Sequence, residues 1–306
     1  MKQFAIPCTI LGAILALPLY VGAAQAQATR TWVSGVGDDV NPCSRTAPCK
    51  TFAGAISKTA TDGEINCLDP GGFGALTIGK AITINCENTL GSVLVSGVNG
   101  ITVNTPAGAV VTLKGIEIEG LNTGLNGINY IGAGILHVHK VQIRKFSTSA
   151  INYSPTGAAE LYVSESYLTD SGTGIVSTPN ASGAIMSVHN VRIENNTNGI
   201  TLNRTLGGAT KATVTESVVS GNGNNGITTS ASSGTITLML QTDVVTNNGN
   251  IGISNNGGVT KIGNSVVTGN GTAVANSGGS FLSYKNNQID DNTATGALPL
   301  GQAGFN

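Results

Sequence analysis

Apolar residues recur at a regular spacing along most of this chain. One apolar position per repeat, spaced 25, 25, 25, 26, 26, 22 and 22 residues from the next, is occupied by Ile118, Ile143, Leu168, Ile193, Val219, Val245, Val267 and Ile289. Five residues upstream lies a second series, Leu113, Val138, Val163, Val188, Val214, Leu240, Ile262 and Tyr284. Two residues further upstream lies a third, Val111, Leu136, Leu161, Met186, Ala212, Leu238, Thr260 and Leu282. The two-residue alternation within each repeat indicates strands broken by one turn.

A further short strand is predicted at the start of each repeat, where a small residue precedes an apolar one. These pairs are Gly100-Ile101, Gly127-Ile128, Ala150-Ile151, Gly174-Ile175, Gly199-Ile200, Gly226-Ile227, Gly252-Ile253 and Ala273-Val274. Three short strands in about 25 residues describe one rung of a coil of parallel strands, and neighbouring rungs must stack because none buries its apolar side alone. We therefore predict an all-β solenoid of about eight or nine rungs, at about 4.8 Å per rung.

The stretch ESVVSGNGNNGI, from Glu216 to Ile227, contains the G-x-G-x-x-G spacing of a dinucleotide-binding loop. Such a loop opens a helix, but the residues that follow, ITTSASSGTITLML, have neither a helical apolar stripe nor a helix-forming run. We therefore interpret these glycines as corner residues of the coil, because Gly and Asn tolerate the left-handed backbone of a sharp turn. The same corner holds Asn196, Asn222, Asn248, Asn270 and Asn292 in five successive rungs. Their stacked amides, about 4.8 Å apart, are predicted to form a hydrogen-bonded ladder.

These repeats resemble the right-handed parallel β-helix family, also called pectin lyase-like, over nearly all of the predicted mature chain. The resemblance implies a single-stranded right-handed parallel β-helix with an N-terminal capping segment. It implies no single activity, because the family includes polysaccharide lyases, hydrolases, epimerases, adhesins and tailspikes. A calcium-binding nonapeptide roll is the nearest alternative, and the sequence lacks the Gly-Gly-x-Gly-x-Asp repeat that it needs.

The segment before the repeats is similar to the N-terminal segment of secreted β-helix proteins. Its stretch PCKTFAGAI, from Pro48, resembles the one that forms a capping helix there, and covering the first rung prevents edge-to-edge aggregation. Cys43 and Cys49 flank a short loop, while Cys67 and Cys86 occupy like points in two INC strands. Four cysteines allow three pairings, and we favour Cys43 with Cys49 and Cys67 with Cys86, in an oxidising compartment. Zinc is the alternative, although no histidine lies near these cysteines in the sequence.

The chain opens MKQFAIPCTILGAILALPLYVGAAQAQA, whose lysine, apolar run and small residues are typical of a secretory signal peptide cleaved after Ala26 or Ala28. The apolar run is too short to span a bilayer comfortably. We therefore predict a secreted protein of the periplasm or the extracellular space, with no membrane span. The expected segments are a signal peptide (1–26), an N-terminal cap with a short helix (27–61), the β-helix (62–293) and a C-terminal tail (294–306).

The charge of the chain argues against two classes of partner. Without Lys2, 14 basic residues stand against 16 acidic ones, so neither nucleic acid nor an anionic membrane surface is indicated. No motif indicates a cofactor, and the oligomeric state cannot be read from the sequence. His137, His139 and His189 could suggest a metal site, but their spacing favours surface histidines over metal ligands.

Charged and aromatic residues gather on the outer face of four middle rungs. Beside the first apolar series stand Glu117, Gln142, Tyr167 and Arg192 on one side, and Glu119, Arg144, Thr169 and Glu194 on the other. A glycan site here would place Tyr167 against a sugar ring, with Gln142, Arg144, Arg192 and Glu194 as polar ligands. Glu117 and Glu119 are weak candidates for an acid and a base, because carboxyls two residues apart on a strand face lie roughly 6–7 Å from each other. Alternatively, Glu119 pairs with Arg144 on a solvated face without catalysis.

The motifs of the family's enzymes are absent from this sequence. The resemblance would imply an Asp pair with Gly-His-Gly in a polygalacturonase, or calcium-binding carboxylates with a basic residue in a pectate lyase, and no such motif maps onto this chain. We therefore predict a secreted non-catalytic β-helix protein of the surface or envelope, with a glycan-binding or structural role and a polysaccharide as partner. The alternative is a divergent polysaccharide lyase or glycoside hydrolase that acts on an acidic polysaccharide.

Overall fold

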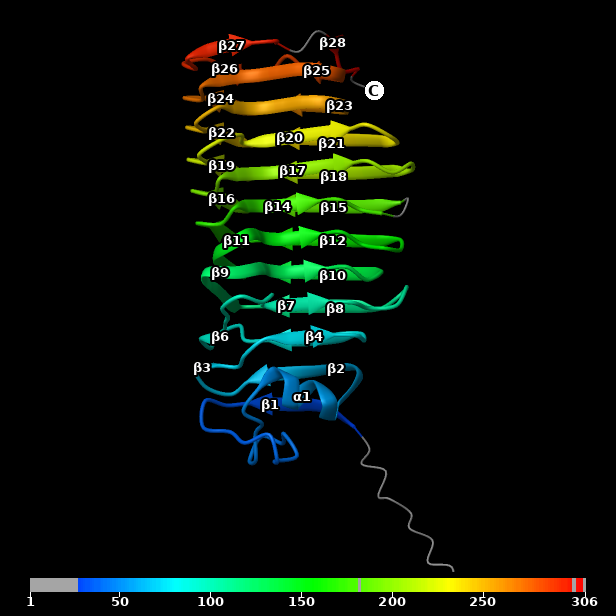
Figure 1. Cartoon of the computed structure of the whole chain (residues 1–306), viewed down its shortest axis with the longest axis vertical. Helices are drawn as coiled ribbons and strands as arrows, with labels where there is room; N and C mark the ends of the chain where they lie inside the picture. The colour runs from blue at the N-terminus through cyan, green and yellow to red at the C-terminus, as the bar shows by residue number, and fades with distance from the viewer. Residues whose placement is uncertain (1–26, 181–182, 299–300, 305–306) are drawn as a thin grey trace, which may run out of the picture.

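The computed structural model describes residues 27–180, 183–298 and 301–304, and in them the chain coils into a parallel β-helix of about nine turns. Figure 1 shows the turns stacked along one long axis, with the N-terminal segment at one end. The predicted solenoid of rungs of about 25 residues is therefore confirmed. The predicted signal peptide, residues 1–26, lies outside the described residues.

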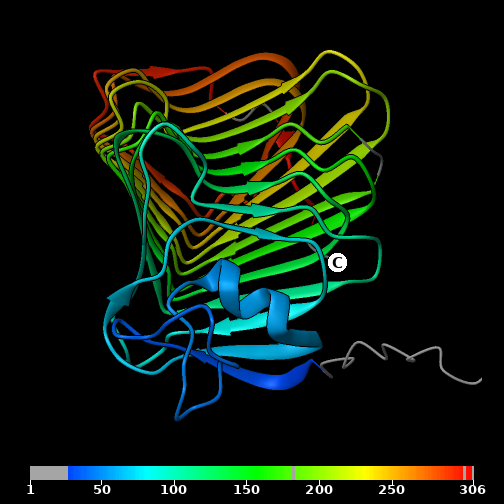
Figure 2. The same cartoon turned by 60° about the horizontal axis from the view of Figure 1, so that its bottom comes forward.

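Three parallel sheets run the length of the coil, and Figure 2 shows how they enclose its interior. The first sheet contains β1 (Ala28–Val33), β2 (Thr59–Cys67), β5 (Ile82–Asn85), β8 (Val110–Lys114), β10 (Gly134–His139), β12 (Ala159–Ser164), β15 (Ala184–His189), β18 (Ala209–Thr215), β21 (Thr235–Gln241), the later parts of β23 (Ile251–Gly263) and β25 (Thr272–Ser283), and β28 (Gly301–Gln302). The second sheet contains β3 (Gly71–Gly72), β6 (Gly91–Leu94), the earlier parts of β9 (Ile116–Tyr130) and β11 (Gln142–Tyr153), β13 (Tyr167–Thr169), β16 (Arg192–Glu194), β19 (Val218–Ser220), β22 (Val244–Thr246), β24 (Val266–Thr268) and β26 (Gln288–Ile289). The third sheet contains β4 (Leu76–Ile78), β7 (Ile101–Val103), the later parts of β9 and β11, β14 (Thr173–Ser177), β17 (Asn198–Arg204), β20 (Ile227–Ala231), the earlier parts of β23 and β25, and β27 (Ala294–Gly296).

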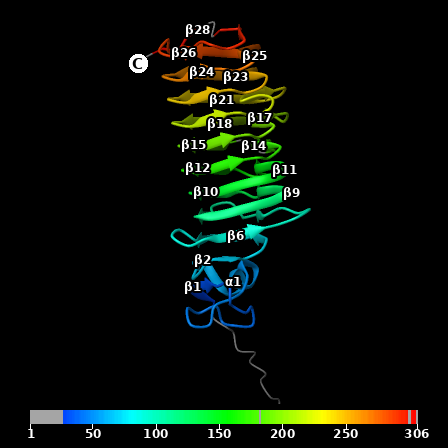
Figure 3. The same cartoon turned by 90° about the vertical axis from the view of Figure 1, so that its left-hand side faces the viewer.

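The predicted apolar series form the core of the coil. In the first series, the residues from Ile118 to Val267 are fully buried, and each pairs in register with its counterpart on the next rung, as Val219 does with Val245. Branched aliphatic residues fill these positions because parallel strands covered on one face pack them densely against the rungs above and below. Figure 3 shows the same stack of strands from another side of the coil.

The last rung departs from the predicted pattern at Leu282 and Tyr284. There Ile262 pairs with Ser283, and Phe281 is 2% exposed, so Ser283 and Phe281 face inward in place of the two predicted residues. The turn that follows is one residue longer than in the preceding rungs, and a shift of one residue exchanges the inner and outer side chains of a strand. The inward Ser283 is tolerated because its hydroxyl accepts two hydrogen bonds from that turn.

The predicted asparagine ladder lies at the corner between the second and third sheets. Each amide Nδ2 donates to the Oδ1 of the next rung, over 3.2 Å for Asn196 to Asn222, 2.8 Å for Asn222 to Asn248, 2.9 Å for Asn248 to Asn270 and 2.9 Å for Asn270 to Asn292. The same oxygens also accept the backbone N–H of the preceding asparagine. The ladder therefore satisfies buried polar groups at a corner where strand pairing is interrupted.

Two glycines of the G-x-G-x-x-G stretch, Gly221 and Gly226, have structural roles at this corner. Gly221 has φ +63°, a left-handed conformation that favours glycine. A Cβ on Gly226 would lie 2.6 Å from the carbonyl oxygen of Gly252 on the next rung. These positions therefore need glycine for turning and for close stacking.

The helix α1 (Phe52–Lys58) forms in the predicted capping stretch and lies across the N-terminal end of the coil (Figure 2). Thr51 is its N-cap and accepts a hydrogen bond from the Gly54 N–H at 2.9 Å. Phe52 is buried with its ring centroid 5.1 Å from that of Phe73, so the helix covers apolar surface that the first rungs would otherwise expose. In the described part of the chain no helix combines the length and apolarity needed to cross a membrane.

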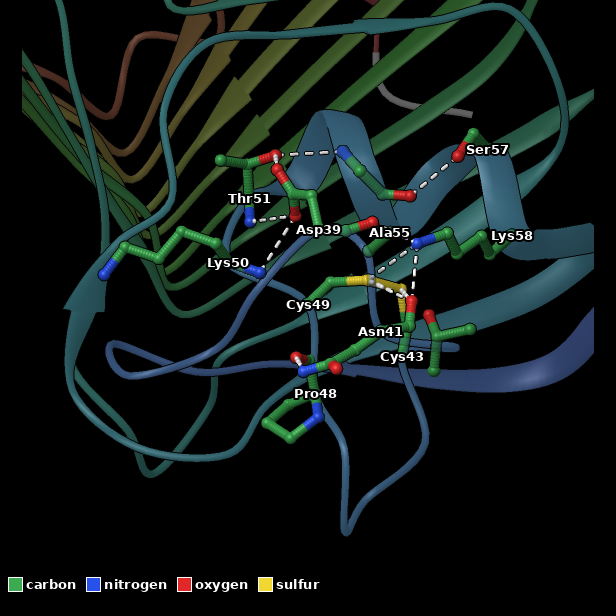
Figure 4. Close-up of a disulfide and its surroundings, with 12 residues drawn as sticks. Asp39, Asn41, Cys43, Pro48, Cys49, Lys50, Thr51, Ala55, Ser57 and Lys58 are labelled. Carbon is green, nitrogen blue, oxygen red and sulfur yellow. Dashed lines mark hydrogen bonds between the residues drawn. A yellow bond between two sulfur atoms is a disulfide. The ribbon is translucent and has the colours of Figure 1, made fainter.

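Both favoured cysteine pairs are disulfides in the structure. Cys43–Cys49 closes the cap loop, and Figure 4 shows Lys58 beside it. Cys67–Cys86 joins successive rungs of the first sheet. A Cβ on Gly91 would lie 2.4 Å from the Cys86 sulfur, so the second disulfide packs against a position that has no room for a side chain.

Candidate functional site

The second sheet brings the predicted site residues into two adjacent rows on its outer face. Strand pairing places Glu117, Gln142, Tyr167 and Arg192 in one row, and Glu119, Arg144, Thr169 and Glu194 in the other. Each residue is thus one rung from the next in its row. We call this surface the middle face.

Arg144 lies at the centre of an ion-pair network on the middle face. Its guanidinium contacts the carboxylate of Glu117 and donates to Glu119 Oε2 at 2.6 Å. Lys145 Nζ donates to the other oxygen of Glu119 at 2.8 Å. The hydrogen bond from Lys145, followed by that from Arg144, holds the pKa of Glu119 below its usual range. A carboxyl in this state is a poor proton donor near neutral pH, so the geometry weighs against Glu119 as a general acid.

The two carboxylates of the suggested acid–base pair are therefore bridged by Arg144. Both Glu117 and Glu119 contact Arg144, whereas the alternative interpretation expected a pair with Glu119 alone. Binding two carboxylates to a single guanidinium cancels much of their mutual repulsion and fixes both side chains.

The upper end of the middle face is also internally paired. Arg192 donates to Glu194 at 2.7 Å, and Ser220 on the next rung donates to the same carboxylate oxygen at 3.1 Å. Thr169, which was expected to point outward into solvent, is 3% exposed, and its hydroxyl has no hydrogen-bond partner among the described residues. Its neighbours in the row, Arg144 and Glu194, have longer side chains and lie one rung before and one rung after it.

An open groove that the sequence did not reveal runs beside the middle face, along the ladder corner. Its volume is about 670 Å³. It is lined by Asn122, Phe146, Ser147, Asp170, Ser171, Gly172, Asn195, Asn196, Thr197, Gly221, Gly223 and Asn224. Asp170 and Asn195 directly follow the middle-face strands β13 and β16, so the groove and the face are neighbours.

The groove is built from corner residues with unusual backbone conformations. Asn122, Asp170 and Asn195 have positive φ values of 62°, 53° and 57°, which turn the chain sharply after each strand of the second sheet. A Cβ on Gly223 would meet no atom closer than 4.0 Å, so this glycine keeps the groove open. The sequence signal for it was the recurrence of Asp or Asn two residues after the first apolar series, at Asp170, Asn195, Asn247 and Asp291.

The three histidines lie apart from the groove, on the outer side of the first sheet. His137 stacks on Tyr162 with ring centroids 5.0 Å apart, and burial lowers its pKa against the opposing effect of Glu160. His139 and His189 hydrogen-bond to hydroxyls on the next rung and are separated by an intervening strand. Within residues 27–180, 183–298 and 301–304, no three or more His, Cys, Asp and Glu residues are grouped so that they could hold a metal ion.

Comparison with solved structures places this geometry among known folds. Pectate lyase Pel9A superposes with a TM-score of 0.69 over 90% of this chain and 78% of that one, at 16% sequence identity. The chain therefore has the pectin lyase-like parallel β-helix fold. A second match, the periplasmic alginate epimerase AlgG, has a TM-score of 0.36 at 14% identity over 78% of this chain and 74% of that one. No protein-family model and no curated protein sequence matches the chain.

Proposed function

We propose that this protein is a secreted, non-catalytic β-helix that binds a polysaccharide in the groove and on the adjoining middle face. The observation that carries the proposal is the open groove of about 670 Å³ lined by amides, hydroxyls and a carboxylate. Side chains of these types exchange hydrogen bonds with sugar hydroxyls, and clefts of this size are typical of binding sites. The disulfides support a location outside the cytoplasm.

A linear glycan suits the repetitive construction of this surface. Asp170, Asn195 and Gly221 occupy the same corner on successive rungs, so similar groups recur along the coil axis at about 4.8 Å per rung. A polymer of repeating sugars would meet equivalent partners as it extends along this axis. Tyr167, on the middle face, adds an aromatic surface against which an apolar sugar face packs.

The ion pairs of the middle face favour binding over catalysis. Glu117 and Glu119 share Arg144, and Glu194 is engaged by Arg192, so these carboxylates already serve to hold neighbouring side chains. A glycosidase needs one carboxyl that keeps its proton near neutral pH, whereas the contacts of Glu119 lower its pKa. We infer that the network orients the wall of the binding surface.

A divergent lyase or hydrolase that acts on an acidic polysaccharide is the second candidate. The observation in its favour is the pair of cations, Arg144 and Lys145, beside the groove. These groups could contact the carboxylates of such a substrate, although both are engaged by Glu119. The fold of pectate lyase Pel9A is compatible with either function, since one fold carries many activities.

Calorimetric titration against neutral and acidic polysaccharides tests the proposal. Gly223→Phe should block the groove and abolish binding, because a side chain at Gly223 projects into open space without a close backbone contact. Gly207→Phe is the matched control, since a Cβ at Gly207 also meets nothing within 4 Å but lies outside the groove.

The same polysaccharides are then incubated with the protein and examined for shortened chains and unsaturated ends. Unchanged polymer, together with binding that Gly223→Phe removes and Gly207→Phe retains, supports a binding protein. Polymer cleavage that depends on Glu117 or Glu119 would replace it with the lyase or hydrolase. Equal binding by both glycine variants would exclude the groove as the site.

A further inference from the structure

A second pocket lies at the N-terminal end of the coil, several rungs away from the groove. It has a volume of about 390 Å³ and is formed by the outer side of β1, the loop closed by Cys43–Cys49 and the end of α1. Arg30 and Trp32 line it from β1, where alternate residues face the same side, and Lys58 lines it from α1.

The backbone around Trp32 is fixed, so the pocket is preformed. The Trp32 N–H donates to the Cys43 carbonyl at 2.8 Å, and the Trp32 carbonyl accepts from the Cys49 N–H at 3.0 Å. The disulfide between Cys43 and Cys49 joins the two loop segments that make these hydrogen bonds with Trp32. Trp32 itself is partly exposed, which leaves part of a large aromatic side chain available at the pocket wall.

Two cationic side chains line this pocket. Its lining includes Arg30 and Lys58 and, among the described residues, no carboxylate. Lys58 is held by the carbonyl oxygens of Asp39 and Asn41 and by the Cys49 sulfur at 3.6 Å, as Figure 4 shows. These contacts fix its ammonium group, which also interacts electrostatically with the Asp39 carboxylate. Arg30 is 59% exposed and contacts Glu64 through one nitrogen at 3.2 Å.

A ligand that complements this pocket carries one negative charge beside an apolar ring face. We propose that the pocket binds a uronic acid residue of an acidic oligosaccharide, with the sugar ring against Trp32 and the carboxylate at Arg30. The Arg30 guanidinium has further N–H groups for a charge-assisted pair with a carboxylate, and the fixed charge of Lys58 adds attraction from the far wall. This inference is independent of the groove and would stand if the groove bound nothing.

The sequence supplies a direct probe, because Trp32 is its single tryptophan. Tryptophan fluorescence therefore reports on this pocket alone. Titration with digalacturonate should give a saturable change in the emission of the disulfide-bonded protein. Galactobiose, which has the same ring without the carboxylates, should give none at the same concentrations.

Variants separate recognition from loss of structure. Arg30→Gln should weaken the digalacturonate response by about tenfold, the loss expected for one charge-assisted contact. Arg45→Gln, an exposed arginine on the same loop but outside the pocket, is the control and should leave the response unchanged. Gly223→Phe should also leave it unchanged, which distinguishes this pocket from the groove. An equal response to galactobiose, no response to digalacturonate, or an Arg30→Gln titration that matches the unsubstituted protein would overturn the proposal.

Discussion

Asn222 Nδ2 lies 2.8 Å from Asn248 Oδ1, and this contact joins two buried side chains on successive rungs. The Asn248 oxygen also accepts the backbone N–H of Asn222 at 3.2 Å, so one side chain satisfies two donors of its neighbour. Its own amide donates to Val219 and to Asn270. Each ladder residue therefore links the rungs on both sides of it.

Replacing Asn248 by Ala should lower the free energy of unfolding by about 3 kcal/mol, because it leaves buried donors of Asn222 without an acceptor. Asn250→Ala is the control. Asn250 also bonds to an asparagine one rung away, Asn224, but it is exposed to water, so its loss should cost less than about 1 kcal/mol. Urea denaturation of both variants measures the difference, and similar losses would show that burial of the ladder is not what makes it stabilising.

A buried carboxyl makes the stability of the coil depend on pH. Asp243 is 1% exposed, and its two oxygens accept the backbone N–H groups of Ser217 and Gln241. Desolvation raises its pKa to about 7, the two hydrogen bonds oppose this rise, and Glu216 adds to it. Between about pH 4 and pH 7 the folded state keeps a proton that the unfolded state releases, so stability falls as the pH rises through this window.

The resulting loss of stability from pH 4 to pH 8 should be on the order of 4 kcal/mol. Asp243→Asn should remove this part of the pH dependence, because the amide cannot ionise yet keeps an oxygen for the Ser217 N–H. Asn287 has this arrangement two rungs further on, where its Oδ1 accepts the Ser265 N–H at 2.9 Å. Thermal unfolding across the pH range measures the effect, and identical profiles for the two proteins would show that Asp243 does not carry it.

Tyr167 provides a test of the middle face. Tyr167→Ala should weaken polysaccharide binding by about fivefold through the loss of an aromatic packing surface, without unfolding a coil whose core lies on the other side of the strand. Val244→Ala, in the same row but on a plain rung, should leave affinity unchanged. Isothermal titration against a responsive polysaccharide provides the measurement. Equal effects of the two substitutions would indicate general destabilisation, and an absence of binding by any polysaccharide would leave the face a solvated surface.

The disulfide Cys67–Cys86 should stabilise the first rungs. Replacing both cysteines by Ser should cost about 3 kcal/mol, because the bridge spans 19 residues of the unfolded chain. Replacing Cys43 and Cys49 should cost less, since that bridge spans 6 residues. Chemical denaturation compares the two double variants, and peptide mapping under non-reducing conditions checks the pairing. Free thiols at Cys67 and Cys86 in the mature protein would contradict it.

The repetition in the sequence was sufficient to predict the coil. Val219 and Val245 lie one period apart with the same neighbours, and Asn222 and Asn248 follow each of them by the same interval. Stacked rungs place equivalent residues on top of one another, so a period in the sequence translates directly into contact between neighbouring turns. The core, the ladder and the rows of the middle face were predictable for this reason.

The groove, the N-terminal pocket and the reversed strand of the last rung depended on tertiary structure. The apolar pattern alone assigned the inward position of the last rung to Tyr284. A turn longer by one residue reversed the inward and outward positions there, so Ser283 faces inward. The groove at Asp170 and the pocket at Trp32 arise where corners, a loop and a helix end come together, and these segments share no period with the strands. Likewise, Arg144 could reach Glu117 as well as Glu119 only because side-chain conformation, which no repeat encodes, brings both carboxylates to one guanidinium.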